Sequence, residues 1–541
     1  VTPQWWDDIW LNESFANWMG YRIGHAWRPD LNIGAGALAE GFAAMGTDEL
    51  TAGRPIRQPI ETNDQIDAAF DTITYGKGGH VVAMIAGFMG DGKFRDGVRR
   101  YMAAHRYGNA TSRDFFAAMA EAAGDPRIIP AMQSFTDQQG VPLLTFTRGE
   151  GGFTVTQSRY APLGAAALAQ RWGVPLCVRR GEARACQLLT DDSAPVAVGG
   201  EGALVPNAGG TGYYRFDLDA ADWDALIAGA GGLSGGEALA AADSLDASVR
   251  AGRASAAQLA ALARVLVNHP DSHAADAATN ELAALAGSGV VDAKGKAGLR
   301  RFVARLYRPV LARYGFDPRA GAYAAEDPDK AQRRAQIVDR LAGTGRDSGL
   351  RKTLNAAAEK YLAGDAAALD PTWYGNAFEI YLNRTRMAGA KALMDKALAS
   401  EDPLFRPAAL DAVANSGDKA VARWLLEDFS DDRLRPAEKR DFLPWILTNG
   451  GTRDLGYAWM RRNLDTLLSG GGGVFYAAKM PQWLRRFCAV EKADEFAREL
   501  RGPFAGKTGA LELERVIDRV RDCGVLKSQR GAAISKDFGK L

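Results

Sequence analysis

The sequence predicts a multidomain, mainly α-helical protein with one small β-sandwich inside it. At 541 residues the chain is too long for one hydrophobic core and corresponds to roughly three or four domains. Apolar residues follow a helical period from residue 1 to about 140, a period of two from about 141 to 219, and a helical period again from about 220 to 541. A hydrophobic fraction of 47% and a charged fraction of 24% are typical of a globular protein.

Helices are predicted across residues 1–140. Apolar side chains recur at helical spacing over 9–19 and again over 81–88. Thr111 is followed three residues later by Asp114, ahead of Phe115 and Phe116, a pattern that predicts a capping box opening another helix.

Two hairpins are predicted in residues 141–219. One joins alternating apolar residues on either side of 149–152, and the other turns at Gly181 and Glu182. Short strands at this spacing with glycine-rich turns indicate a β-sandwich.

The four cysteines give two candidate pairs. A turn at Gly181 and Glu182 places Cys177 opposite Cys186 as a non-hydrogen-bonded pair, which suits a cross-strand disulfide. Cys488 and Cys523 offer a second bridge, although buried free thiols are the alternative for both pairs. Disulfides would favour a periplasmic or secreted location over a cytoplasmic one.

Residues 220–541 are rich in Ala and Leu and are divided by short Gly, Asp and Pro breaks. Consecutive helices of this kind cannot each bury an apolar stripe alone, so we expect them to stack into a superhelical array that acts mainly as a scaffold.

Charge and hydropathy exclude several partners. A formal net charge of +1 provides no global field for nucleic acid or an anionic membrane. The apolar run at 81–89 is far shorter than the ~20 residues of a membrane span, so we expect no membrane span in this segment.

The run Trp5-Trp6-Asp7-Asp8-Ile9-Trp10-Leu11-Asn12-Glu13-Ser14-Phe15-Ala16 resembles the helix that carries the third zinc ligand of the gluzincin aminopeptidases, the aminopeptidase N family. The resemblance implies that Glu13 is a ligand of one Zn²⁺ in the intact enzyme. Taken alone, such a Glu is more typical of a solvated helix surface. Asn17, one turn along the helix, is expected to hold the Glu13 carboxylate.

A second motif, Thr74-Tyr75-Gly76-Lys77-Gly78-Gly79, resembles the Ser/Thr-Tyr-x-Lys-Gly-Ala signature of the same family. The resemblance implies that Tyr75 is catalytic and stabilises the tetrahedral intermediate, because a phenol donates a hydrogen bond without adding a charge. A half-buried packing tyrosine is the alternative. We expect Lys77 to be a structural cation, and His80 departs from the family pattern.

The resemblance also sets the expected domains. Residues 1–140 would be the C-terminal helical part of a thermolysin-like zinc peptidase domain, 141–219 the β-sandwich, and 220–541 a HEAT-like helical domain. Arg54-Pro55-Ile56 is similar to the family's turn ahead of the active-site tyrosine.

The implied function is a zinc-dependent aminopeptidase that removes N-terminal residues from peptides with a free N-terminus and works as a monomer. In the family, a His-Glu-x-x-His motif precedes the ligand Glu by eighteen residues, whereas twelve residues precede Glu13. We therefore expect a chain truncated after that motif and inactive alone. The alternative is a non-catalytic helical scaffold or peptide-binding protein, and the coding sequence upstream of Val1 discriminates between the two.

His269 and His273 offer a different metal pair by spacing. Pro270 lies between them, and Asp271 or Ser272 is expected to cap a helix, so the two imidazoles should not share a helical face.

Overall fold

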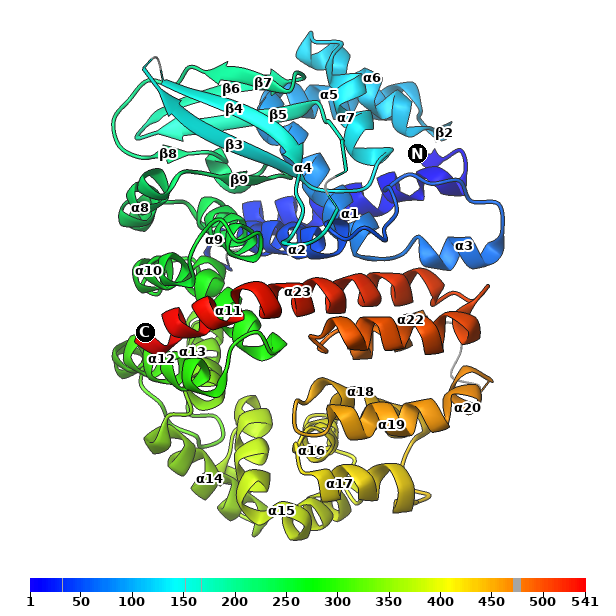
Figure 1. Ribbon diagram of the computed structural model, residues 1–541, viewed down its shortest axis with the longest axis vertical. Helices are drawn as coiled ribbons and strands as arrows, with labels where there is room; N and C mark the ends of the chain where they lie inside the picture. Colours follow the sequence, from blue (N-terminus) through cyan, green and yellow to red (C-terminus); the bar gives the residue numbers. More distant parts are fainter. Residues whose placement is uncertain (32, 151, 167, 470–477) are drawn as a thin grey trace. The chain divides into compact units, whose positions relative to one another are not determined.

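The computed structural model describes residues 1–31, 33–150, 152–166, 168–469 and 478–541 (Figure 1). The chain forms two compact units. The first comprises Val1–Gly295, Cys488–Ala497 and Ile517–Lys540, and the second comprises Lys296–Phe487, Arg498–Val516 and Leu541. Glu13 and Tyr75 both belong to the first unit.

The first unit opens with the predicted helices. They are α1 (Ile9–Trp27), α2 (Ile33–Asp48), α3 (Asn63–Ala68), α4 (Gly78–Met89), α5 (Asp91–Ala104), α6 (Ser112–Ala123) and α7 (Ile128–Thr136). The capping box at Thr111 and Asp114 is present at the start of α6. Two features were not predicted: a parallel pair of short strands, β1 (Thr2–Pro3) and β2 (Asn109–Ala110), and a π-helical turn, η3 (Ile73–Lys77), directly before α4.

Two small sheets follow. Their strands are β3 (Pro142–Gly149), β4 (Gly152–Arg159), β5 (Val174–Arg180), β6 (Ala183–Leu189), β7 (Ser193–Val196), β8 (Leu204–Val205) and β9 (Arg215–Asp217). One sheet has the order β7-β4-β3-β9 and the other β6-β5-β8. Strand β4 alternates exposed and buried residues along its whole length, the pattern of a strand with one face on the core.

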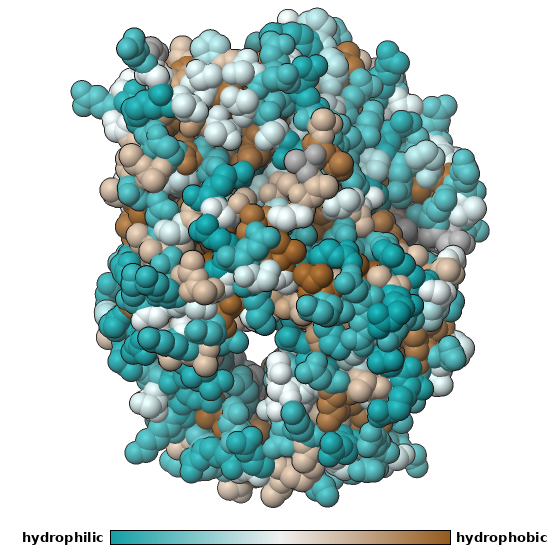
Figure 2. Space-filling model, in the orientation of Figure 1, coloured by the Kyte–Doolittle hydropathy of each residue, from teal (hydrophilic) through white to brown (hydrophobic). Residues whose placement is uncertain are grey.

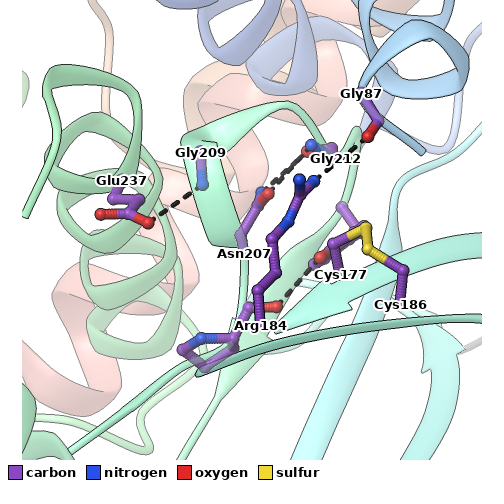
Figure 3. Close-up of a disulfide and its surroundings, with 10 residues drawn as sticks. Gly87, Cys177, Arg184, Cys186, Asn207, Gly209, Gly212 and Glu237 are labelled. Atoms are coloured by element: carbon purple, nitrogen blue, oxygen red, sulfur yellow. Dashed lines mark hydrogen bonds between the residues drawn. A yellow bond between two sulfur atoms is a disulfide. The ribbon is translucent and has the colours of Figure 1, made fainter. Parts of the chain in front are cut away.

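The predicted register of the second hairpin is confirmed. Cys177 faces Cys186 across β5 and β6, and a disulfide joins them (Figure 3). Figure 3 also shows Arg184 of β6 reaching away from the hairpin, where its guanidinium donates to the Gly87 carbonyl of α4 at 3.1 Å. The hairpin is therefore bonded to the helix that follows the π-helical turn. A second disulfide joins Cys488 and Cys523.

The rest of the described chain is helical. Its α-helices are α8 (Ala220–Ala228), α9 (Gly235–Arg250), α10 (Ala256–Leu266), α11 (Ser272–Ser288), α12 (Ala293–Tyr314), α13 (Pro328–Asp339), α14 (Ser348–Leu362), α15 (Tyr374–Leu398), α16 (Phe405–Ala414), α17 (Lys419–Arg423), α18 (Pro436–Thr448), α19 (Arg453–Arg462), α20 (Leu464–Ser469), α22 (Val490–Phe504) and α23 (Ala510–Lys540). Further π-helical turns, η6 (Arg340–Thr344) and η9 (Trp424–Asp428), follow α13 and α17.

Asp271 caps α11 as predicted, and its carboxylate accepts from the backbone N–H groups of His273 and Ala274. His269 therefore precedes the helix, while His273 lies inside it.

Across the described helices, none is long and apolar enough to cross a bilayer. On the face shown in Figure 2, hydrophobic residues are interspersed with hydrophilic ones.

Candidate active site

Glu13 lies on α1 at a position fixed by its buried neighbours. Trp10 is buried and its indole N–H donates to the Ser112 hydroxyl at 3.0 Å. Ser14 is fully buried and its hydroxyl donates to the Thr74 carbonyl at 2.7 Å. These two contacts hold α1 against α6 on one side and against the π-helical turn on the other. Glu13 itself is partly exposed.

Tyr75 sits in the π-helical turn and meets Glu13 directly. Its phenol O–H donates to Glu13 Oε2 at 2.7 Å, joining residues 62 positions apart. Burial, followed by the hydrogen bond to Glu13 and its charge, raises the pKa of Tyr75 to about 12. The phenol therefore keeps its proton near neutral pH and remains a hydrogen-bond donor.

The π-helical turn is held by a buried ion pair. Lys77 Nζ lies 2.9 Å from Asp48 Oδ2, and both side chains are almost completely buried. The other Asp48 oxygen accepts from the backbone N–H of Gly140 at 2.9 Å, while Lys77 also donates to the Gln138 carbonyl at 3.1 Å. The expected structural role of Lys77 therefore has a specific partner at the end of α2.

Arg54 holds the start of the same turn, a role the sequence did not reveal. Its guanidinium donates to the Thr74 hydroxyl at 3.0 Å, to the Ala69 carbonyl at 3.0 Å and to the Asp71 carboxylate at 2.6 Å. The side chain is 4% exposed. Arg54 is part of the Arg-Pro-Ile motif, but that motif does not predict the hydrogen bond from Arg54 to Thr74.

Close packing accounts for the glycines on either side of Lys77. A Cβ on Gly78 would lie 2.0 Å from Ser14 Oγ, and one on Gly76 would lie 2.8 Å from Ala44 Cβ. Because real Cβ atoms do not approach so closely, α1 and α2 can reach the π-helical turn only if these positions lack a side chain.

Asn17 does not hold the Glu13 carboxylate, so this expectation was wrong. Its amide donates instead to Glu40 Oε2 on α2 at 3.1 Å, and the Tyr21 hydroxyl donates to the same oxygen at 3.0 Å. One helical turn carries Asn17 to the side of α1 that faces α2, whereas Glu13 meets the π-helical turn.

His80, which departed from the family pattern, is a buried core residue. Its ring packs edge-on against Phe42 and Tyr213, with ring centroids 4.9 Å and 5.7 Å away. Burial lowers the pKa of His80 to about 4, although the carbonyls of residues 210–212 act in the opposite direction. Neither ring nitrogen reaches hydrogen-bonding geometry with a partner in the described chain. The imidazole is therefore neutral and packed among aromatic rings.

The described residues do not by themselves form a zinc site. Across residues 1–31, 33–150, 152–166, 168–469 and 478–541, no three His, Cys, Asp or Glu side chains lie close enough together to hold a metal ion. Catalytic zinc needs three protein ligands, and Glu13 is a single carboxylate.

Comparison with known proteins gives two family matches. The Peptidase family M1 domain matches residues 1–138, the part that contains Glu13 and Tyr75. The ERAP1-like C-terminal domain matches residues 203–522, most of the helical region.

Three of the relatives that match are named aminopeptidases. Aminopeptidase N of Lactobacillus delbrueckii subsp. lactis is 25% identical over 513 residues, covering 92% of this chain and 59% of the relative. Aminopeptidase M1 of Arabidopsis thaliana is 24% identical over 549 residues, covering 95% of this chain and 61% of the relative. The alanine/arginine aminopeptidase of Saccharomyces cerevisiae is 33% identical over 165 residues, covering 30% of this chain and 19% of the relative.

Two of these relatives, the Lactobacillus and Arabidopsis proteins, match this chain along most of its length. The chain spans about three fifths of the length of each of them. The two family matches together cover the candidate site and most of the helical region. The chain belongs to the M1 peptidase family and has an ERAP1-like C-terminal domain.

Proposed function

We propose that this chain contributes Glu13 and Tyr75 to the active site of a zinc-dependent aminopeptidase. The observation that carries the proposal is the 2.7 Å hydrogen bond from the Tyr75 phenol to Glu13 Oε2. Two motifs singled out separately for their resemblance to one family meet at a single point. Buried contacts hold both elements in place: hydrogen bonds of Trp10 and Ser14 fix α1, and the Lys77–Asp48 ion pair fixes the π-helical turn.

In this proposal Tyr75 supplies the donor for the oxyanion that forms when the peptide carbonyl is attacked. A donor of this kind is worth about 3 kcal/mol in the transition state. The raised pKa of Tyr75 keeps the donor proton in place near neutral pH. Glu13 is the ligand that the family resemblance assigns to the metal, and the 541 residues contain no His-Glu-x-x-His string to supply the two histidine ligands.

The substrates proposed are peptides with a free N-terminus, and the enzyme is proposed to act as a monomer. Support comes from the M1 family match and from relatives that are named aminopeptidases. The two disulfides support a location in an oxidising compartment.

The test uses the protein encoded by the whole open reading frame that contains these 541 codons. Bound zinc is measured by plasma mass spectrometry and activity by release of an aminoacyl anilide. Glu13→Gln should lose bound zinc and activity together. Tyr75→Phe should keep zinc at the wild-type level and lower kcat by about 10²–10³-fold.

The 541-residue chain alone is the matched control and should bind no stoichiometric zinc and cleave no anilide. Robust activity from it would contradict the proposal that the two histidine ligands are not supplied by these 541 residues. An inactive, zinc-free full-length product would instead support a non-catalytic scaffold.

A further inference from the structure

Helix α23 is bonded to the end of α2 and to the turn that follows it. The Asp518 carboxylate accepts from the backbone N–H of Ala52 at 2.7 Å, and the Arg519 guanidinium donates to the Gly46 carbonyl at 2.6 Å. These residues all belong to the first unit. Since α2 supports the π-helical turn through Asp48, the two bonds join α23 to that supporting helix.

A network of buried ion pairs begins at the same end of α2. Glu49, directly after α2, pairs with Arg215 of β9. Arg215 also lies 3.0 Å from the Asp243 carboxylate of α9. One turn further along α9, Asp246 pairs with Arg250 at 2.5 Å. These side chains are buried or mostly buried, so solvent ions screen their charges only weakly.

Asp522 of α23 lies beside these contacts without a partner of its own. It follows Asp518 by one helical turn, so it lies on the face of α23 that meets α2. Within the described parts of the chain, its carboxyl forms no hydrogen bond and no ion pair. The guanidinium groups near it are already engaged, Arg519 by the Gly46 carbonyl and Arg521 by Asp494 of α22 at 2.7 Å. The charged groups that act on its carboxyl are Glu49, Asp518, Arg521 and Arg519.

These surroundings favour the neutral form of the Asp522 carboxyl. Burial, followed by the charges of Glu49 and Asp518, raises the pKa of Asp522 from 3.8 to about 7. The charges of Arg521 and Arg519 act in the opposite direction. The carboxyl therefore holds its proton in mildly acidic solution and loses it near neutral pH. Its ionisation places a new negative charge beside Asp518, the residue that accepts from the turn after α2.

We propose that the Asp522 carboxyl is a pH-sensitive switch that controls how firmly α23 is bonded to the end of α2. While the carboxyl is protonated, both hydrogen bonds from α23 are kept. When it ionises, repulsion from Asp518 and Glu49 weakens them. The disulfide between Cys488 and Cys523 does not depend on this proton and keeps α23 tethered, so the change is a local loosening of the helix.

Hydrogen–deuterium exchange of the 541-residue chain tests the switch, because the Ala52 amide is one of the bonded groups. Mass spectrometry follows the peptide that covers residues 46–53 at about pH 5.5 and about pH 8.5, with labelling times scaled for the intrinsic pH dependence of exchange. The contribution of Asp522 to closure is fully present below pH 3.8 and is lost as the pH rises through about 7. Protection of this peptide should therefore fall at least roughly tenfold between the two pH values.

Asp522→Asn is the decisive variant because asparagine has nearly the shape of the protonated carboxyl and cannot ionise. Its protection should match wild type at the acidic pH and stay at that level at the alkaline one. Asp522→Ser, which is also neutral, should behave in the same way and covers the case in which the Asn variant does not fold. Asp537→Asn removes a carboxylate several turns further along α23 and should keep the wild-type pH dependence.

A second peptide separates local loosening from opening of the whole unit. Glu281 of α11 also ionises in this pH range, and its effect on the stability of the first unit is reported by α6 (Ser112–Ala123). The loss of protection in the 46–53 peptide should exceed the loss in α6.

Three results would overturn the proposal. They are an equal loss in the two peptides, a wild-type pH dependence in both neutral variants at residue 522, and low protection in those variants at both pH values. None of these measurements involves zinc or substrate, so the switch and the proposed function are tested independently.

Discussion

Lys77 Nζ and Asp48 Oδ2 lie 2.9 Å apart in a position almost closed to solvent, two residues from Tyr75. The Tyr213 hydroxyl also donates to Asp48 Oδ2, at 3.2 Å. This ion pair fixes the π-helical turn against α2, and the turn in turn places the Tyr75 phenol on Glu13.

Removing one member of this pair should be costly. Lys77→Met leaves Asp48 buried without its cation, so we expect the free energy of unfolding in urea to fall by about 3–5 kcal/mol. Lys93→Met, which removes an exposed lysine that donates to the Ala123 carbonyl, should change it by less than about 0.5 kcal/mol. A loss below about 1 kcal/mol in Lys77→Met would show that the pair does not hold the turn.

Gly41 and His80 should be coupled. A Cβ on Gly41 would lie 2.0 Å from His80 Nδ1, so Gly41→Ala should lower the free energy of unfolding by about 1–3 kcal/mol. His80→Ala removes the ring that clashes. In a double-mutant cycle, the combined variant should lose less than the sum of the two single losses. Strict additivity would mean that the helices relax around the new methyl group.

Glu281 should make stability depend on pH. This residue of α11 retains some solvent exposure. Burial, followed by the charge of Asp246, nevertheless raises the pKa of Glu281 from 4.5 to about 8. The charge of Asp243 also raises this pKa, whereas the charges of Arg250 and Arg215 lower it. The folded carboxyl therefore holds its proton after the unfolded one has lost it. Its contribution to stability is present below about pH 4.5 and is lost as the pH rises through about 8.

Glu281→Gln removes this dependence. The variant should unfold with a free energy about 1–2 kcal/mol higher than wild type at about pH 9, and with little difference at about pH 5. Urea titrations at both pH values measure it. A gain of the same size at both pH values would point to packing rather than to ionisation.

The disulfides should be detectable directly. Mass spectrometry after alkylation should find no modified cysteine without reductant and four modified cysteines after reduction and unfolding. Cys488→Ala with Cys523→Ala should lower the free energy of unfolding by roughly 3–4 kcal/mol, because the bridge closes a loop with a sequence separation of 35. Alkylation of the intact protein without reductant would contradict this pairing.

Local sequence patterns predicted several parts of this structure. The pairing of Cys177 with Cys186 followed from one turn and a period of two, and the capping box at Thr111 followed from its own spacing. Such features depend on a few consecutive residues, so no knowledge of distant contacts is needed.

Distant partners could not be read in this way. No residue near Lys77 in the sequence predicts that its ion-pair partner is Asp48. The position of Asn17 on its helix likewise does not predict that its amide donates to Glu40 instead of Glu13. These contacts depend on how α1, α2 and the π-helical turn pack. The meeting of Glu13 with Tyr75 was implied only by the family resemblance.

The central claim is that Glu13 and Tyr75 serve one active site in different roles. The most direct measurement compares Glu13→Gln and Tyr75→Phe in the full-length product, with zinc content and kcat determined on the same samples. The account predicts loss of zinc in the first variant, and wild-type zinc with kcat lowered by about 10²–10³-fold in the second. Wild-type kcat in Tyr75→Phe, or full zinc content and activity in Glu13→Gln, would contradict it.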